Sequence, residues 1–320
     1  MGSRRYLLSK TLQAVVTLWF VLTFNFLLFR VLGDPVALLV RSERLTEQDV
    51  ARLQHELGLD RPMIQQYAIY MRETLSGHLG ESLRTGKEVK EVIGVRVWPT
   101  VLLVGLGTLL ATYFGVVIGI RGGWNRGSRF DTTSQYSSLI LYAMPEGWLG
   151  MLLLLLFSGW LHWFPAGGYS SGGLTGISRI IDVANHLFLP LLTLTLGYIG
   201  SYAIIMRSSM IDTTHEDFVQ TARAKGVPER QLRKRHVVPN AFLPTFTLIF
   251  LSFGFVLGGA IVIETVFSWP GLGYLTYNAI RTLDYPVIQA VFLIASAAVI
   301  LANLVADVTY GYLDPRIKNA

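Results

Sequence analysis

Residues 212–244 read DTTHEDFVQTARAKGVPERQLRKRHVVPNAFLP, a polar and basic stretch between two strongly apolar ones. Gly226, Pro228, Pro239 and Pro244 divide the stretch into short pieces, because glycine ends helices and proline begins or interrupts them. The apolar neighbours on both sides are long enough to cross a membrane. The stretch is therefore interpreted as a loop between two membrane helices, and it indicates a membrane protein that contacts a partner at the membrane surface.

The composition of the 320-residue chain also indicates a membrane protein. Hydrophobic residues make up 52% and charged residues 15%, with a mean hydropathy of +0.46, whereas soluble domains carry about 25% charged residues. The chain has no cysteine, which excludes disulfides and thiolate catalysis. It has no G-x-x-x-x-G-K-[ST] motif, so ATP hydrolysis would need a partner. The six histidines have no metal-ligand spacing, and we expect neither a metal nor a cofactor.

Six apolar stretches approach or exceed the roughly 20 residues that a membrane helix needs. They are 8–32, 98–120, 134–160, 186–206, 241–266 and 286–312. The first is too long for a signal peptide and lacks an A-x-A-like cleavage site, so we expect it to be retained. The sequence thus predicts an all-α integral membrane protein with six transmembrane helices. Its expected parts are 1–32 (N-terminus and first helix), 33–97 (a small external domain), 98–313 (the membrane core, with a cytoplasmic loop 207–240) and 314–320 (a tail).

The distribution of lysine and arginine predicts the orientation. These residues concentrate at the N-terminus, around 121–129, in the 207–240 loop and in the tail, while the two short loops on the opposite side carry only Arg179 and Arg281. Because positive charge marks cytoplasmic loops, both termini are expected in the cytoplasm. The pI near 9.5 then reflects this bias, and no nucleic-acid partner is expected.

The segment 33–97 predicts two external helices. One covers 49–57 and ends at Gly58, and the other covers Met63–Leu75 and begins after Pro62. A segment of this size buries little core. We therefore expect a lid or docking surface rather than an independent fold.

The cytoplasmic loop predicts a helix, a sharp turn and a second helix. Thr213 or Thr214 can cap the first helix, Glu216 and Asp217 suit its first turn, and Gly226 suits its C-terminal turn. A second short helix is expected over 229–237, and the prolines at 239 and 244 lead into the fifth span.

Two interpretations of this loop remain open on the residues alone. Phe218, Ala222 and Lys225 share one face, and the small Ala222 and Gly226 would let a partner's backbone approach closely. The alternative is an amphipathic connector on anionic lipid, which the run Arg233-Lys234-Arg235 would also favour.

A resemblance to a known family favours the first interpretation. The pattern Gln220-Thr221-Ala222-x3-Gly226-x9-His236-x-Val238-Pro239 resembles the EAA motif of ABC importer permeases, E-A-A-x3-G-x9-I-x-L-P. The Gly-to-Pro spacing is the same, while Glu, the first Ala, Ile and Leu are replaced. The string TARAKG at 221–226 is typical of the peptide/nickel branch, in which the chain resembles the B-type subunit of oligopeptide and dipeptide systems.

Further motifs of this branch follow one another along nearly the whole chain. They are Gly33-Asp34-Pro35, Gly58-Leu59-Asp60-Arg61-Pro62 before Gln66-Tyr67, Gly77-x-Leu79-Gly80-x-Ser82, Pro99-Thr100, Glu264-x-x-Phe267-x-x-Pro270-Gly271-x-Gly273, Asp284-Tyr285-Pro286 and Asn303-x3-Asp307-x2-Tyr310-x3-Asp314-Pro315-Arg316. Each motif is weak alone, but their order is specific.

The resemblance implies a type I ABC importer permease fold and a non-catalytic transport subunit. Such a subunit lies in the plasma membrane of a bacterium or archaeon and forms half of a pathway that works by alternating access. The implied partners are a second homologous permease subunit (a heterodimer in the family pattern), two cytosolic ATPase subunits or domains that bind ATP and Mg, an external solute-binding protein and membrane lipid. Di- or oligopeptides are the implied cargo, with nickel complexes or oligosaccharides as alternatives.

The resemblance also implies which residues couple the subunit to its ATPase. They are Glu216, Asp217, Phe218, Gln220, Thr221, Ala222, Arg223, Lys225, Gly226 and Pro239. Gln220 stands where the family has Glu, so a contact that depends on that charge is not expected here.

Pro145, Glu146 and Glu264, all in apolar stretches, are candidate pathway or gate residues. Glu146 follows Pro145 in the third predicted span, where a carboxylate is costly and faces a cavity or a partner. The family usually has Ser-x-Pro-x-Phe where this chain has Ala143-x-Pro145-x-Gly147. Glu146 could line the pathway, pair with a partner subunit or lie near the membrane interface. Glu264 could accept hydrogen bonds from loop amides, form an intersubunit pair, or act at an outer gate.

Two other classes of protein fit less well. An ion-coupled secondary transporter would have two related halves with broken helices and several midplane charges, and the sequence has no convincing repeat. A membrane enzyme would need a nucleophile with its base or a metal cluster, and the sequence contains neither pattern.

Overall fold

The computed structural model describes residues 2–31, 60–256 and 260–313. Every regular element in these ranges is a helix, and the one β-type contact is an isolated bridge between Glu81 and Glu88. In chain order they are α1 (Gly2–Val31), α4 (Met63–Leu75), α5 (Val89–Trp124), α6 (Arg129–Ala143), α7 (Glu146–Leu153), the π-helix η1 (Leu154–Trp160), α8 (Gly176–Thr214), α9 (Asp217–Ala224), α10 (Glu229–Gln231), the π-helix η2 (Leu232–Val237), α11 (Val238–Val256), α12 (Ile261–Val266), α13 (Leu272–Thr282) and α14 (Tyr285–Leu313).

Within the described residues, four helices are long and apolar enough to cross a membrane: α1, α5, α8 and α14. A fifth crossing is present if α6 and the α7–η1 helix count as one span. The fifth predicted stretch, 241–266, falls on α11 and α12, which are separated by residues outside the described ranges. The all-helical, multi-span architecture is therefore confirmed, whereas the number six stays a prediction.

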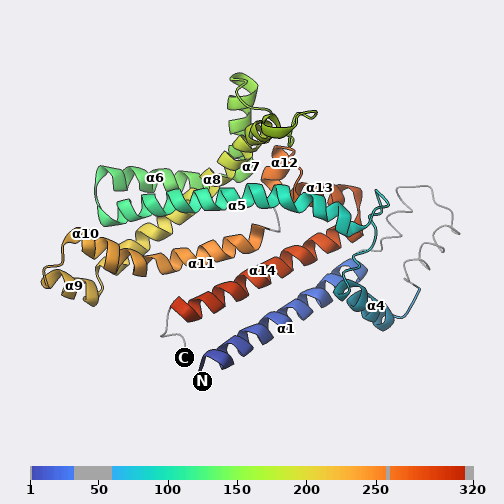
Figure 1. Cartoon of the computed structure of the whole chain (residues 1–320), viewed down its shortest axis with the longest axis horizontal. Helices are drawn as coiled ribbons and strands as arrows, with labels where there is room; N and C mark the ends of the chain where they lie inside the picture. The colour runs from blue at the N-terminus through green and yellow to red at the C-terminus, as the bar shows by residue number, and fades with distance from the viewer. Residues whose placement is uncertain (1, 32–59, 257–259, 314–320) are drawn as a thin grey trace.

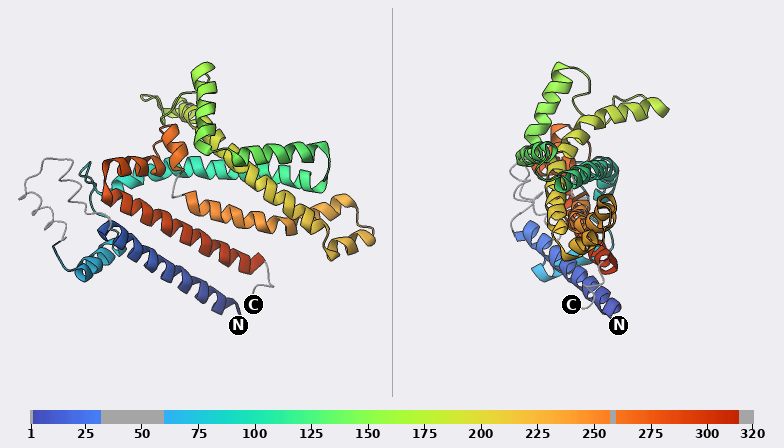
Figure 2. Two further views of the ribbon diagram at one scale, coloured as in Figure 1. Left: turned by 180° about the vertical axis from the view of Figure 1, so that it is seen from behind. Right: turned by 90° about the vertical axis from the view of Figure 1, so that its left-hand side faces the viewer.

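The long helices lie side by side along one axis of the molecule (Figure 1). The α9–α10 loop lies at one end of that axis and α4 at the other, so the predicted cytoplasmic and external parts are at opposite ends (Figure 1). The α7–η1 helix turns away from this array in both views of Figure 2. The first turns of α1 meet the end of α14, where Lys10 Nζ lies 3.1 Å from Asp307 Oδ2.

The third predicted span, 134–160, is not one straight helix. Its two parts meet at an angle of 101°. Met144 and Pro145 have extended backbones, with ψ near 130° for both residues. A proline disfavours the helical conformation of the residue before it and supplies no N–H for the helix ladder. Pro145 therefore ends α6, and Glu146 begins a new helix.

The most extensive helix pair is α5 with α8. Glycines at 107, 115, 119 and 123 recur at multiples of four along α5 and face α8. A Cβ at Gly119 would lie 2.6 Å from Cβ of Met206 and 2.7 Å from the carbonyl oxygen of Ala203, distances that no real side chain adopts. Because these glycines bring the two backbones into contact, as small residues do in membrane helix pairs, α5 and α8 form one tightly packed unit.

The predicted external segment 33–97 is described only from residue 60 onward. Helix α4 has the predicted bounds Met63–Leu75 after Pro62, while the helix expected at 49–57 lies outside the described residues. Residues 89–97 are the first turns of α5, so the segment continues directly into the membrane core.

Two motifs about two hundred positions apart meet beside α4. Ser82 Oγ donates a 2.5 Å hydrogen bond to Asp284 Oδ2, and the Leu83 N–H donates a 3.1 Å bond to Oδ1. The buried Asp284 carboxylate therefore fastens the loop before α5 to the junction of α13 and α14.

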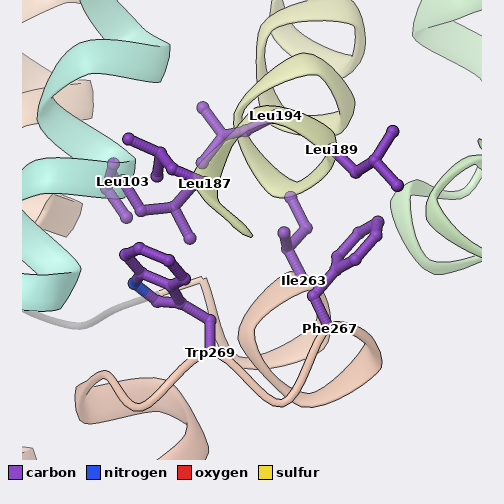
Figure 3. Packing of buried hydrophobic residues seen from close by; sticks show 8 residues of the cluster. Leu103, Leu187, Leu189, Leu194, Ile263, Phe267 and Trp269 are labelled. Atoms are coloured by element: carbon purple, nitrogen blue, oxygen red, sulfur yellow. The ribbon is translucent and has the colours of Figure 1, made fainter. Parts of the chain in front are cut away.

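A buried apolar cluster lies where α5, α8 and α12 meet. Figure 3 shows Leu103 of α5, Leu187, Leu189 and Leu194 of α8, and Ile263, Phe267 and Trp269 from α12 and the turn that follows it. All seven side chains are buried. The cluster holds the short α12 against the α5–α8 pair.

Candidate functional site

The loop predicted at 207–240 begins later than the sequence suggested. Helix α8 extends through Thr214, and α9 starts at Asp217 with Glu216 as its N-cap residue. The expectation that Thr213 or Thr214 caps α9 is therefore wrong. Thr214 instead bonds back to the Ile211 carbonyl within the last turn of α8. Asp217 lies in the first turn of α9, where a negative charge suits the helix dipole.

The end of α9 has the predicted geometry. Gly226 has φ +78°, a conformation that costs glycine little. The Gly226 N–H bonds the Arg223 carbonyl at 3.0 Å and the Val227 N–H bonds the Ala222 carbonyl at 3.2 Å. This pair of bonds is the Schellman motif of a helix C-terminus. Gly226 is thus required for the backbone turn itself.

The second half of the loop continues into α11 without a break. Pro228 caps α10, and the widened turns of η2 follow. The Val238 N–H bonds the Arg233 carbonyl, five residues earlier. Pro239, in the first turn of α11, has no N–H to donate and is exposed. The basic side chains of η2 accordingly lie directly beside the start of α11.

The orientation of α9 differs from the expectation for Ala222. Val219 and Ala222 are buried against Met206 and Met210 of α8 and against Leu232 of η2. Ala222 therefore seats α9 on its own chain and does not face a partner. The exposed side of α9 carries Phe218, Gln220, Thr221, Arg223 and Lys225.

Phe218 is the large apolar side chain on this side, with 43% of its surface exposed. Two polar contacts hold the neighbouring side chains. Gln220 Nε2 donates to the Thr214 carbonyl at 3.2 Å, and Arg223 Nε lies 2.9 Å from Glu229 Oε1. Gln220 thus closes the α8–α9 turn.

Glu264 lies at the centre of a second site, which we call the outer hub and define by Thr100, Glu264, Trp269, Gly271 and Leu272. The Glu264 carboxylate is fully buried. It accepts hydrogen bonds from Thr100 Oγ1 at 2.8 Å and from the Tyr274 N–H at 2.9 Å. The second bond places the carboxylate at the N-terminus of α13, where orphan N–H groups need an acceptor.

The other residues of the hub are also hydrogen-bonded and tightly packed. Thr100 Oγ1 accepts a 2.7 Å bond from the Leu272 N–H, and Trp269 Nε1 donates a 2.9 Å bond to the Pro99 carbonyl. Gly271 leaves no room for a Cβ, which would overlap Thr100 Oγ1 and both Glu264 carboxylate oxygens. The hub thereby joins α5 to α12 and α13, and Glu264 is placed as an acceptor for loop amides.

Glu146 occupies a different environment at the bend between α6 and α7. Its side chain is partly exposed and lies beside the Tyr198 hydroxyl of α8. A Cβ at Gly197 would lie 3.5 Å from Glu146 Cγ, so the carboxylate side chain passes over the surface of α8 at a glycine. Pro145 shapes the bend that presents Glu146 at this surface.

An ion pair that the sequence did not predict joins α6 to α8. Arg207 of α8 binds Asp131 of α6 through both Nε and Nη2, the latter at 2.9 Å from Oδ2. Asp131 is buried and also accepts a 2.9 Å bond from the Gly127 N–H. The pattern Ser128-x-x-Asp131 is a helix-capping signature, and Ser128 does cap α6, but the pattern gives no indication of Arg207.

No group of three potential metal ligands occurs in the described ranges 2–31, 60–256 and 260–313. The polar contacts of both sites instead hold helices together, and neither arrangement resembles a catalytic centre.

Comparison with protein families identifies what the chain is similar to. The family described as "binding-protein-dependent transport system inner membrane component" matches residues 111–319. The companion family for the N-terminal part of such membrane components matches residues 3–101. Together the two matches include both the α9 loop and the outer hub.

Individual relatives align over nearly their whole length. A Brucella suis protein provisionally named as a peptide permease is 39% identical, with 98% of this chain and 99% of the relative covered. The di/tripeptide transport system permease protein of Pseudomonas aeruginosa is 36% identical over 95% of this chain and 96% of its own. The oligopeptide transport system permease protein of Bacillus subtilis is 32% identical over 98% and 99%.

Proposed function

The chain belongs to the family of inner membrane components of binding-protein-dependent transport systems, and from this premise we propose that it forms half of the translocation pathway of an ATP-driven peptide importer. It is a multi-pass membrane permease subunit. The observation that carries the proposal is the α9 loop, a compact helix seated on the longest helix pair of the protein with one side exposed.

Di- or oligopeptides are the proposed cargo. Support comes from relatives in three organisms, whose names assign them to peptide transport. Nickel complexes and oligosaccharides are the alternatives within the branch, and none of those relatives is named for them.

The proposed assembly contains a second homologous permease subunit, two cytosolic ATPase subunits or domains, and an external solute-binding protein. We also propose six crossings and cytoplasmic termini, which would put the α9 loop in the cytosol. The positive-inside distribution and the position of the loop at the end of the molecule opposite α4 support this orientation (Figure 1).

We propose that the exposed side of α9 docks on the ATPase. Phe218 would be its apolar anchor, with Thr221 and Lys225 beside it. Val219, Ala222 and Gly226 would act indirectly, because they hold α9 in place. This division separates contact residues from positioning residues within the ten candidates of the loop.

The test is ATP-dependent uptake of a labelled dipeptide by proteoliposomes that contain the purified complex, with its solute-binding protein supplied. We expect uptake with ATP and none without it. Uptake driven by a proton gradient in the absence of the ATPase would refute the proposal.

Docking is tested with Phe218→Asp. We expect the variant to remain in the membrane but to lose the co-purified ATPase, because a charge replaces the exposed anchor. The matched control is Arg230→Asp, another exposed residue of the same loop outside α9. Equal ATPase recovery with both variants would contradict docking through α9.

A further inference from the structure

A cavity of about 310 Å³ opens beside the outer hub, on the side that we assign as external. The first turns of α5, the loop before α8 and the turn between α12 and α13 form its walls. Its lining residues are Val95, Arg96, Trp98, Pro99, Tyr169 and Pro270. This volume is at the lower end of the range for small-molecule sites, which are largely apolar with a few polar groups.

The walls of the cavity are mostly apolar and aromatic. Val95 and Trp98 are 71% and 63% exposed, so their surfaces are open to a ligand. The ring of Tyr169 packs against Trp269, with 5.0 Å between the centroids. Since Trp269 is fully buried in the hub, this wall is held in place.

Arg96 is the one charged residue in the lining. Its Nη1 donates a 3.4 Å hydrogen bond to the Pro270 carbonyl, and the described residues supply no carboxylate partner for it. A guanidinium carries five N–H donors in a planar fork. That fork matches a carboxylate in a bidentate geometry, so the cavity suits a ligand with an apolar body and a carboxylate.

We propose that this cavity binds the carboxylate end of a peptide, with Arg96 holding the carboxylate and with Trp98 and Tyr169 contacting the last side chain. The proposal rests on the proposed function of peptide import. A terminal carboxylate is common to all linear peptides, while apolar walls accept many side chains. One fixed cation with adaptable walls therefore fits a transporter that handles peptides of different sequence.

The test is saturation-transfer NMR on the complete transport complex in nanodiscs, without the solute-binding protein. The probes are the dipeptide Ala-Leu and its C-terminal amide. We expect saturation of the leucine methyl groups for Ala-Leu. The amide and the Arg96→Gln variant should each weaken binding by about tenfold, because a charged hydrogen-bonded pair is lost.

Further variants distinguish contact from structural damage. Trp98→Ala keeps Arg96 and should also weaken the signal, whereas Arg84→Gln, an exposed arginine of the external loop, should leave it unchanged. Arg96→Lys keeps the charge without the planar fork and should fall between the parent and Arg96→Gln. If Arg96→Gln does not fold, the comparison of acid with amide on the parent complex still decides.

Equal signals for the acid and the amide on the parent complex would overturn the proposal. Failure of the proposed function is a separate result, because it would be seen as absent ATP-dependent dipeptide uptake by the parent complex. Uptake together with equal acid and amide signals would reject the cavity alone.

Discussion

Glu264 and Glu146 are both carboxylates in strongly apolar sequence, yet their surroundings in the folded protein are opposite. Glu264 is fully buried and accepts hydrogen bonds from the Thr100 hydroxyl and from the Tyr274 N–H in the first turn of α13. Glu146 lies at a bend, is partly exposed and has the Tyr198 hydroxyl beside it.

The difference shows that an acidic residue in a membrane helix is not by itself a pathway residue. A buried carboxylate is tolerated when donors surround it, and it then becomes part of the scaffold. A carboxylate at an exposed bend keeps part of its hydrogen-bonding capacity for another molecule. We therefore assign Glu264 to the scaffold and retain Glu146 as the candidate for the pathway.

The largest expected effect is that of Glu264→Ala. The substitution leaves the Thr100 hydroxyl and the Tyr274 N–H without their acceptor, and each buried unsatisfied donor costs about 1–3 kcal/mol. We expect a large loss of monodisperse protein in fluorescence-detected size exclusion and a clearly lower melting temperature. Glu264→Gln, which keeps one acceptor oxygen, should lose less. An unchanged melting temperature for Glu264→Ala would contradict the scaffold assignment.

Gly271→Ala tests the same hub from the other side. Its Cβ would overlap Thr100 Oγ1 and the Glu264 carboxylate, and overpacking of this kind costs about 1–3 kcal/mol. The control is Gly105→Ala in α5, where nothing lies within 4 Å of the added Cβ. The measurement is again the melting temperature, which should fall for Gly271→Ala and not for Gly105→Ala. Equal behaviour of the two variants would show that the hub is loosely packed.

Glu146→Gln should separate function from stability. The residue is partly exposed, and substitutions of such residues usually change stability by no more than about 0.5 kcal/mol. We expect a normal melting temperature but an altered rate or altered preference among dipeptides of different charge, measured by uptake in proteoliposomes. Unchanged transport across neutral, acidic and basic dipeptides would remove Glu146 from the pathway.

Tyr198→Phe should have the smallest effect. It removes the hydroxyl that lies beside Glu146, a contact worth about 1 kcal/mol at most in a partly exposed setting. Its transport profile should shift in the same direction as that of Glu146→Gln. The double variant should add little to either single change, since the two groups interact directly. Fully additive effects would argue that Tyr198 and Glu146 act independently.

The sequence predicted regular elements best where local chemistry decides them. Pro62 begins α4 and Gly226 ends α9 as expected, because each residue imposes its own backbone conformation. The sequence placed Pro145 inside a single predicted span, 134–160, and did not predict the sharp bend there. The angle of 101° depends on how α7 packs on α8 and α12, and those contacts are distant in sequence.

Other features could not be predicted from the sequence, because contacts between distant segments decide them. A face of α9 that includes Ala222 was predicted, but its direction was wrong, because Met206 and Leu232 supply the apolar surface that covers it. The pairing of Ser82 with Asp284 and of Arg207 with Asp131 was also missed. Each member of these pairs is unremarkable in its own segment, so only the fold brings the partners together.

The glycine seam between α5 and α8 has a mechanical consequence. At Gly115, Gly119 and Gly123 the nearest atoms of α8 are Cβ and backbone atoms, so sliding the helices along each other would bring the two backbones into collision. We therefore expect α5 and α8 to move together as one rigid body. One end of α5 contacts the cluster under α9 through Val116, Ile120 and Trp124, and the other reaches the outer hub through Thr100. A tilt applied at the α9 end of this pair would therefore also move the end that carries the hub.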